Sequence, residues 1–318
     1  MFLPYRLLTS HFHSISKMKK IFLSILIIAL FQDFCNAQQS IRNMVRREYI
    51  FGAGATNFLG DLGGANQIGT NGMKDFDFPA IRPAFVIGYR YRLSESTAYK
   101  INFAYAFLAG NDKFTKEPFR NNRNCNFRAG VFEFNTQFEY AVVRERPGHI
   151  YILKGVKGLK YIQISSYLFA GAGVMYFNPK GQWGDKWYKL KPLCTEGEGL
   201  IPARNKYSNV QFVIPLGVGF KFALSKDWSM GIEYGIRKTF TDYIDDVSKT
   251  YFDTNALYFH GGHLAVHFSN PTNLSLGPSP TAPGEQRGDP KDKDAYMFAF
   301  VSFFYKIPKG SYTLPKFR

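Results

Sequence analysis

Large apolar residues alternate with small or polar residues in the segment 210–224 of this chain. One face of that segment is apolar at eight successive positions: Val210, Phe212, Ile214, Leu216, Val218, Phe220, Phe222 and Leu224. A period of two residues predicts a β-strand. Because a strand in a soluble protein is usually about 5 to 6 residues long, a stripe of this length favours a tilted strand that crosses a membrane with lipid against its apolar face.

The same alternation recurs along the chain, with two short polar turns, residues 94–96 and 225–227, between neighbouring segments. Turns this short predict antiparallel hairpins. The pattern therefore predicts an all-β fold, an eight-stranded antiparallel transmembrane β-barrel with long extracellular loops. The expected strands lie at 48–58, 85–93, 99–107, 127–142, 161–177, 210–224, 228–237 and 295–307.

The lengths of the connections orient this barrel. Short turns face the periplasm and long loops face outward in such proteins, and an even number of strands returns both termini to the periplasm. One periplasmic link, residues 143–160, is longer than the two turns, and it is therefore a candidate for contact with a partner. The expected external loops are 59–79, 110–126, 179–208 and 241–294.

The amino terminus has the organisation of an export signal. Lys19 and Lys20 precede the apolar run 21–31, which leads to a cleavage site after Ala37. Such a run is too short for the roughly 20 residues of a spanning helix, so residues 1–37 are expected to be a cleaved signal peptide. A lipoprotein would use Cys35, but Asp33 and Phe34 stand where small residues are expected.

The signal peptide and the expected strands together divide the chain into segments. Met18 opens a conventional signal peptide, so residues 1–17 are interpreted as sequence upstream of the true start. Residues 38–47 form a periplasmic segment, 48–307 the barrel and 308–318 a periplasmic tail. No run of 18 apolar residues follows the signal, which leaves no helical span in the mature chain. The expected location is the cell outer membrane.

Composition supports strands and an anionic environment. Aromatic residues make up 17% of the chain, and there are 29 glycines, an enrichment that suits strands better than helices. The formal net charge of +16 suits anionic partners or lipid headgroups. Nucleic acid is not an expected partner, because the chain is exported and carries no nucleic-acid fold signature.

Charged side chains recur on the inward faces of the expected strands. An eight-stranded barrel is just wide enough inside to be filled by its own side chains, so these residues are expected to form an ion-pair network that plugs the lumen. A transport role is the alternative interpretation. The network comprises Arg82, Arg90, Arg92, Lys100, Glu133, Glu139, Lys221, Glu233 and Arg237, with Gln137 beside them.

Motifs for catalysis, nucleotide binding or structural zinc are not found in the sequence. His260, His263 and His267 match no established ligand spacing, and Asp242, Asp245 and Asp246 lack the spacing of a calcium loop. The glycines in 60–64 indicate a turn rather than a phosphate cradle, since no helix follows. No enzyme activity, cofactor or metal is therefore expected.

Two cysteines, Cys125 and Cys194, fall in expected external loops. In an oxidising compartment they could form a disulfide with each other. Two free thiols, or pairing between molecules, are equally open at this point, because sequence alone does not give the distance between them.

Basic residues collect on the expected periplasmic pieces. Arg42, Arg46 and Arg47 precede the first strand, and Lys309, Lys316 and Arg318 follow the last; the acids there are chiefly Glu48 and Glu145. This basic rim is expected either to dock an acidic protein surface or to meet lipid headgroups. The partner-binding candidates in and beside the long link are Arg144, Arg146, Tyr151, Lys154, Lys157 and Lys160, with Ile152 as a further apolar anchor.

Several segments together resemble one known family. They are 57–64 (NFLGDLGG), 121–124 (NNRN) before Phe127 and Arg128, 133–140, 237–248 (RKTFTDYIDDVS), 287–289 (RGD) and 294–296 (DAY). In order and spacing they resemble the PorG family of the Bacteroidota type IX secretion system, over about residues 48–307.

The resemblance implies a function that periodicity does not give. It implies an outer-membrane barrel that tethers a periplasmic ring, made of a PorK/GldK-type lipoprotein and a PorN/GldN-type partner, to the translocon. Such a protein serves protein export and often gliding motility, and the family offers no catalytic residues to carry over. The alternative is a small outer-membrane channel or ligand-binding barrel unrelated to secretion.

Overall fold

The computed structural model describes residues 46–63, 77–144, 164–225 and 227–307. The expected signal peptide, most of the segment 38–47 and the tail 308–318 lie outside these residues. The strands are β1 (Arg47–Leu59), β2 (Arg82–Arg92), β3 (Thr97–Asn111), β4 (Asn126–Val143), β5 (Ile164–Trp183), β6 (Lys186–Lys189), β7 (Val210–Ala223), β8 (Trp228–Thr239) and β9 (Ala295–Lys306). The helices of more than one turn are α2 (Pro118–Arg123) and α3 (Thr254–Ser269).

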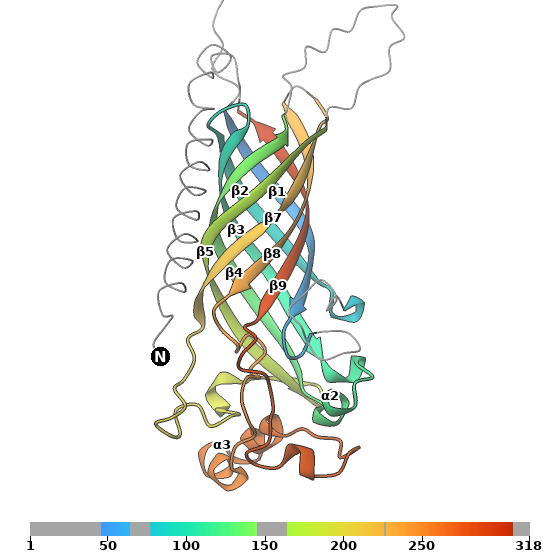
Figure 1. Cartoon of the computed structure of the whole chain (residues 1–318), viewed down its shortest axis with the longest axis vertical. Helices are drawn as coiled ribbons and strands as arrows, with labels where there is room; N and C mark the ends of the chain where they lie inside the picture. The colour runs from blue at the N-terminus through green and yellow to red at the C-terminus, as the bar shows by residue number, and fades with distance from the viewer. Residues whose placement is uncertain (1–45, 64–76, 145–163, 226, 308–318) are drawn as a thin grey trace, which may run out of the picture. The chain divides into compact units, whose positions relative to one another are not determined.

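Eight of the strands form a closed antiparallel barrel. The sheet order is β4-β3-β2-β1-β9-β8-β7-β5, and pairing of β4 with β5 closes it. The predicted fold class is therefore confirmed, and each of the eight predicted segments overlaps one strand of the barrel. Figure 1 shows the tight β2–β3 and β7–β8 turns at one end and the long loops with α2 and α3 at the other. We call these the turn end and the cap end.

The longest strand extends beyond the predicted segment 161–177. β5 continues to Trp183, turns at Gly184 and pairs with the short β6. Gly184 has a φ of 59°, a left-handed conformation that glycine adopts without steric cost. β6 pairs with β5 alone and lies outside the closed ring. Alternation of apolar residues could not predict this extension, because its outward side chains are polar.

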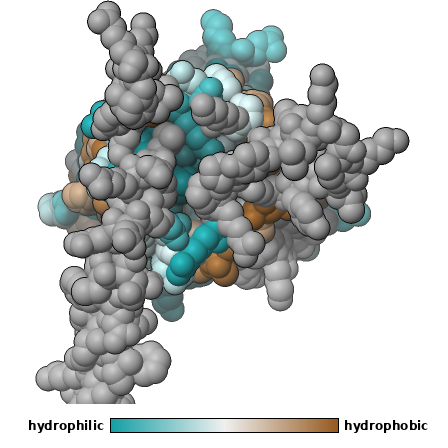
Figure 2. All heavy atoms as spheres, turned by 90° about the horizontal axis from the view of Figure 1, so that it is seen from above, coloured by the Kyte–Doolittle hydropathy of each residue, from teal (hydrophilic) through white to brown (hydrophobic). Residues whose placement is uncertain are grey.

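The outer wall of the barrel is apolar. Large side chains point away from the lumen, including Phe212, Ile87 and Phe51, which are 71%, 55% and 51% exposed. In the view from the turn end, hydrophilic residues lie toward the centre and hydrophobic residues around the outside (Figure 2). A closed barrel satisfies its backbone hydrogen bonds internally, and an apolar wall is stable only against lipid. The barrel is thus an outer-membrane protein.

Within the described residues, no helix is long and apolar enough to cross a membrane.

Glycines on the inner face of β7 and β8 make room for aromatic side chains. Gly217 and Gly235 pair across these strands, and a Cβ at Gly217 would lie 2.5 Å from Cζ of Phe169. A side chain at either position would displace that ring. The ring centroid of Phe169 in turn lies 5.1 Å from Nζ of Lys100. The two glycines therefore help to position Lys100 in the lumen, because they leave room for the Phe169 ring.

The cap end is folded rather than a set of open loops. In α2, the side chain of Glu117 accepts a hydrogen bond from the amide of Arg120, and left-handed Asn124 ends the helix. Asp253 caps α3 in the same way, and α3 is kinked at Gly262, which has a φ of 63°. Phe58, Phe127, Phe177 and their neighbours form an apolar core between the lumen and the cap.

Candidate functional site

Glu48 lies at the centre of the charged side chains in the lumen at the turn end. Its carboxylate is completely buried and accepts hydrogen bonds from Lys221 Nζ at 2.7 and 2.8 Å, Arg90 at 3.0 Å and Arg92 at 3.4 Å. Three cations from two different strands therefore converge on one carboxylate. Such buried charge pairs are costly to break, because either partner alone would be an uncompensated charge.

A second group of charges continues the network along the lumen. Glu139 accepts a hydrogen bond from Arg90 Nε at 2.6 Å, and Lys100 Nζ lies 3.2 Å from its other oxygen. Lys100 also contacts Glu233, whose carboxylate accepts a hydrogen bond from the hydroxyl of Tyr167 at 2.6 Å. This chain of contacts connects β2, β3, β4, β5 and β8.

A third group lies nearer the cap end. Arg237 Nε is 3.6 Å from Glu133, which accepts hydrogen bonds from Tyr296 Oη at 2.6 Å and from Asn135. The guanidinium of Arg237 sits 4.4 Å from the ring centroid of Phe298. With these contacts, all eight barrel strands contribute a side chain to the lumen network.

Two sequence interpretations of the charges need correction. The structure brings together eight of the nine predicted network residues, but Arg82 stands apart at the cap end of β2 and donates to the carbonyls of Pro79 and Ile81. Glu48, interpreted above as an acid of the periplasmic rim, is instead the centre of the network. Its neighbour Arg47 is exposed while Glu48 faces inward, so strand alternation at the first residues of β1 explains the difference.

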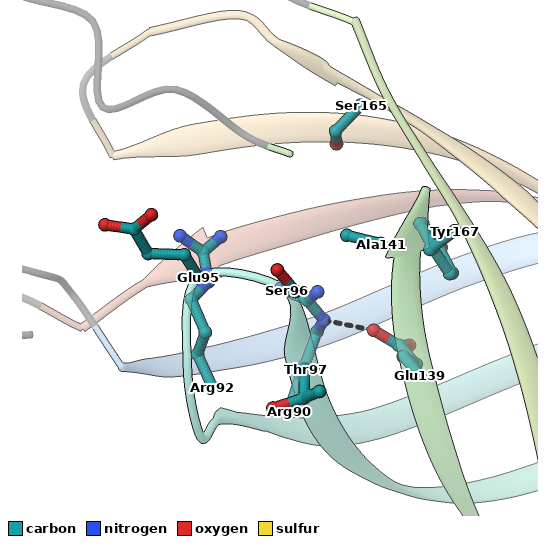
Figure 3. Close-up of a pocket in the computed structure, with 9 residues that line it drawn as sticks. All are labelled: Arg90, Arg92, Glu95, Ser96, Thr97, Glu139, Ala141, Ser165 and Tyr167. Atoms are coloured by element: carbon teal, nitrogen blue, oxygen red, sulfur yellow. Dashed lines mark hydrogen bonds and ion pairs between the residues drawn. The ribbon is translucent and has the colours of Figure 1, made fainter. Parts of the chain in front are cut away.

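A small cavity opens at the turn end of this network. It has a volume of about 10 Å³ and is lined by Arg90, Arg92, Glu95, Glu139, Ser165 and Tyr167, among others. Figure 3 shows these side chains around the Arg90–Glu139 contact. The volume corresponds to about one water molecule, so the mouth is narrow where the ion pairs begin.

The predicted basic rim is only partly visible. Arg144 is exposed at the end of β4, 3.9 Å from Glu95. Arg146, Tyr151, Lys154, Lys157 and Lys160 lie outside the described residues. The docking interpretation of the rim stays a prediction.

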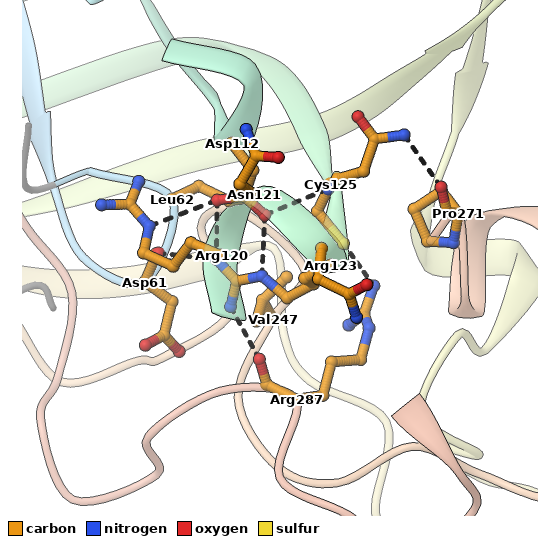
Figure 4. Close-up of polar contacts among 12 residues, drawn as sticks. Asp61, Leu62, Asp112, Arg120, Asn121, Arg123, Cys125, Val247, Pro271 and Arg287 are labelled. Carbon is orange, nitrogen blue, oxygen red and sulfur yellow. Dashed lines mark hydrogen bonds and ion pairs between the residues drawn. The ribbon is translucent and has the colours of Figure 1, made fainter. Parts of the chain in front are cut away.

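Two buried arginines hold the cap together (Figure 4). Arg123 of α2 donates to Asp112 at 2.7 and 2.9 Å and to the carbonyls of Arg287 and Asp61 at 2.6 and 2.8 Å. Arg287 donates to Glu196 at 2.9 Å and to the carbonyls of Asp246, Phe268 and Ser269. Residues 61–62, 121–124, 237–248 and 287–289 thus meet in one hydrogen-bonded cluster, which we call the cap cluster.

Several buried carboxyl groups complete the cap cluster. Asp245 accepts from the amides of Leu62 and Val247, both at 3.0 Å, and Asp294 accepts from the amide of Ile244 at 2.8 Å. Burial raises the pKa of Asp61 and Asp246 to about 6, that of Asp242 to about 7 and that of Glu198 to about 8. Neighbouring acids raise these pKa values further, so the deprotonated forms of the cluster's carboxyl groups are disfavoured.

The two loop cysteines are not bridged. Cys125 and Cys194 are both free and buried. Burial raises the pKa of the Cys125 thiol to about 11, and its sulfur lies 3.9 Å from Nη2 of Arg287. The structure therefore does not contain the disulfide between Cys125 and Cys194.

The histidines lie on a helix rather than on an open loop. His260 contacts the carbonyl of Pro192 at 3.3 Å, and the ring of His267 stacks on Trp183 with centroids 4.3 Å apart. Burial lowers the pKa of His267. Among the residues that the structure describes, no group of three or more His, Cys, Asp or Glu could hold a metal ion.

The cap also contains a cavity. Its volume is about 350 Å³, and its lining includes Asp61, Arg120, Arg123, Tyr251, Arg287 and Asp289. That size is at the lower end of small-molecule sites. Sequence reasoning missed this cavity, because its walls come from three loops that only the folded cap brings together.

Comparison with known proteins gives few functional leads. The model of a domain family of unknown function, DUF6089, matches residues 19–171. No curated protein matches. Among solved structures, the chain is similar to Ail, the attachment invasion locus protein of Yersinia pestis, with 10% identity, 82% of this chain and 99% of that chain covered, and a TM-score of 0.36.

Two other outer-membrane structures are similar. Neisserial surface protein A has 8% identity, with 83% of this chain and 98% of that chain covered and a TM-score of 0.36. OprG from Pseudomonas aeruginosa has 8% identity, with 84% and 99% covered and a TM-score of 0.33.

Proposed function

We propose that this chain is a structural outer-membrane component of the type IX protein secretion system. In this role the barrel is an anchor: it tethers a periplasmic ring of PorK/GldK-type and PorN/GldN-type proteins to the outer membrane and supports protein export and gliding. Neither catalysis nor a cofactor is part of this proposal. The named system rests on the resemblance of the segments 57–64, 121–124, 237–248 and 287–289 to the PorG family.

The observation that carries the anchor role is the charge-filled lumen. Glu48, Glu133, Glu139 and Glu233 are buried and paired with cations from neighbouring and opposite strands. A conducting pore needs water in its lumen, whereas a plugged eight-stranded barrel serves as a rigid support. This supports a membrane anchor over a channel.

The periplasmic side supplies the contact surface in this proposal. The link 143–160 carries Lys154, Lys157 and Lys160, and an acidic ring surface would complement them. Tyr151 would supply an aromatic anchor, a residue type that is enriched where interfaces concentrate binding energy.

Reversing charge in the link tests the proposal. The variant Lys154→Glu, Lys157→Glu, Lys160→Glu should lose co-purification with the ring proteins, while a matched reversal of cap lysines, Lys113→Glu, Lys249→Glu, Lys291→Glu, should retain it. Both variants are first checked for an intact, membrane-inserted barrel. Unchanged recovery of the ring with the link variant would rule out docking through this surface.

The cap cavity favours a second candidate, a ligand-binding barrel. Its volume of about 350 Å³ suits a small molecule, and Arg120, Arg123 and Asp289 in its lining could orient a charged group of that molecule. Planar-bilayer recordings and ligand screening on the purified barrel separate the two candidates. An anchor should give no conductance and no stoichiometric small ligand; a ligand that binds the cap and is lost on Tyr251→Ala would favour the second candidate.

A further inference from the structure

Three cations lie side by side on the outer wall of the barrel, on three adjacent strands. Arg128 of β4 pairs in register with Lys180 of β5, which pairs with Lys189 of β6. Residues directly opposite each other on antiparallel strands project to the same face, with Cβ atoms about 5 Å apart. We call Arg128, Lys180 and Lys189 the cation row.

The cation row faces outward. Along β4, Arg128 follows the same alternation as the lipid-facing Phe132, Phe134 and Phe138, and all four side chains are exposed. Lys189 is exposed and Lys180 half-buried. The guanidinium of Arg128 stacks 4.0 Å from the ring centroid of Trp187, which holds it against the wall.

Among the residues that the structure describes, no anionic side chain balances the row. In the described parts of the chain, none of Arg128, Lys180 and Lys189 forms an ion pair. Like charges directly opposite each other on neighbouring strands destabilise a sheet. Among the described residues, the repulsion between these three cations is thus uncompensated, and a bound external anion would offset that repulsion.

The position of the row along the barrel axis places it at the outward-facing headgroup layer of the membrane. Tyr140, at the turn end of β4, is on the same outward face as Arg128, twelve residues away. A rise of about 3.3 Å per residue and a tilt of about 40° give roughly 30 Å along the membrane normal, the thickness of a hydrocarbon core. With Tyr140 at the inner interface, Arg128 lies at the level of the outer headgroups.

The surface just below the row suits acyl chains. Phe132 pairs in register with Tyr105 and Tyr176, and the rings of Tyr105 and Phe132 are 4.5 Å apart. Between these rings and the row stands Gly130, where an added Cβ would find its nearest neighbour at 3.8 Å. Gly130 adds no side chain to the wall at this level. An apolar patch, a glycine and three cations follow one another toward the outside.

We propose that the cation row binds the phosphate-bearing headgroup of an anionic lipid in the outer leaflet. The phosphate accepts charge-assisted hydrogen bonds from Arg128, Lys180 and Lys189. The acyl chains of the same lipid cover the apolar patch of Phe132, Tyr105 and Tyr176. Arg128 supplies planar donors suited to phosphate, and the lysines supply point charges.

Native mass spectrometry of the full chain in detergent tests this site. The probes are lipid A with its phosphates, the same lipid without phosphates, and inorganic phosphate in excess. The wild type should retain the phosphorylated lipid roughly tenfold better than the phosphate-free lipid. The row variant Arg128→Gln, Lys180→Gln, Lys189→Gln should lose that preference. A control, Lys113→Gln, Lys238→Gln, Lys291→Gln, removes the same charge elsewhere and should keep it.

Defined outcomes overturn the proposal. If the wild type retains the two lipids equally, the proposal is wrong. This comparison needs no variant, so the test stays valid if the row variant fails to fold. An unchanged preference for the phosphorylated lipid in a folded row variant would also overturn the proposal. Displacement of the lipid by inorganic phosphate would identify the site as one for free phosphate and reject the lipid assignment.

Discussion

Lys221 Nζ lies 2.7 Å from Oε2 of Glu48, a residue 173 positions earlier in the chain. The two residues belong to β7 and β1, which β8 and β9 separate in the sheet. Their contact therefore crosses the lumen instead of following a strand pair. It links the two sides of the barrel, and Arg90 and Arg92 share the same carboxylate.

Neutralising Glu48 is predicted to destabilise the barrel. Glu48→Gln leaves three buried cations with less compensation, and breaking a buried pair costs roughly 3–5 kcal/mol. Urea unfolding in detergent or lipid vesicles should show a lower free energy of unfolding. In a double-mutant cycle, Lys221→Met should cost much less in the Glu48→Gln background than in the wild type. Additive effects of the two substitutions would contradict the contact.

Gly217 is predicted to be intolerant of a side chain. Gly217→Ala places a methyl group against Phe169 and the backbone of β8, so we expect a loss of about 1–3 kcal/mol in unfolding free energy. Gly130→Ala is the matched control, since its added methyl would make only an ordinary van der Waals contact, 3.8 Å from Oη of Tyr105, on the outer wall. Similar urea midpoints for both variants would show that the lumen does not need the close approach.

Arg287 is predicted to hold the cap without holding the barrel. Arg287→Met removes the partner of Glu196 and the donor to the carbonyls of Asp246, Phe268 and Ser269. Limited proteolysis of intact cells should cleave the variant's external loops much faster than those of the wild type, while barrel insertion persists. Exposed Lys291→Met serves as the control. Protease resistance equal to the wild type would contradict the role of this guanidinium.

The cap is predicted to be more stable in mild acid. Burial raises the pKa of Asp61 to about 6 and that of Asp242 to about 7, whereas an unfolded Asp titrates near about 3.9. The folded cap thus binds more protons than the unfolded cap between these values. This stabilisation is complete below about pH 4 and is lost as the pH rises through about 6 to 7.

Hydrogen exchange measures this pH dependence. Protection of cap amides, corrected for intrinsic exchange rates, should be higher at about pH 5 than at about pH 8. Asp242→Asn should flatten the dependence, because it removes one of the titrating groups. Protection that rises with pH would contradict the raised pKa values.

Local alternation was sufficient to predict the barrel but not its internal contacts. Inward and outward residues of a strand are fixed by a period of two, which placed Lys221 and Glu233 in the lumen from sequence. The partner of Lys221 depends instead on how far the strands are staggered when the barrel closes. No local pattern encodes that stagger, so the contact between Lys221 and Glu48 could not be predicted from the sequence.

The cap was beyond sequence reasoning for a different reason. Its loops have no apolar periodicity, and Gly261 and Gly262 within α3 disfavour a helix prediction over the histidine segment. The buried contacts of Arg123 and Arg287 join residues up to 164 positions apart. The segments 57–64 and 237–248 stand out in the sequence by their resemblance to one family, but their meeting point requires the fold.

Affinity purification of the full chain from native outer membranes tests the central claim most directly. The barrel is solubilised in mild detergent, and the proteins recovered with it are identified by mass spectrometry. We predict that periplasmic ring proteins of the PorK/GldK and PorN/GldN type are recovered with the wild type and lost with the Lys154, Lys157 and Lys160 charge reversal. Recovery of the barrel alone, combined with ion conductance of the pure protein in planar bilayers, would contradict the anchor role.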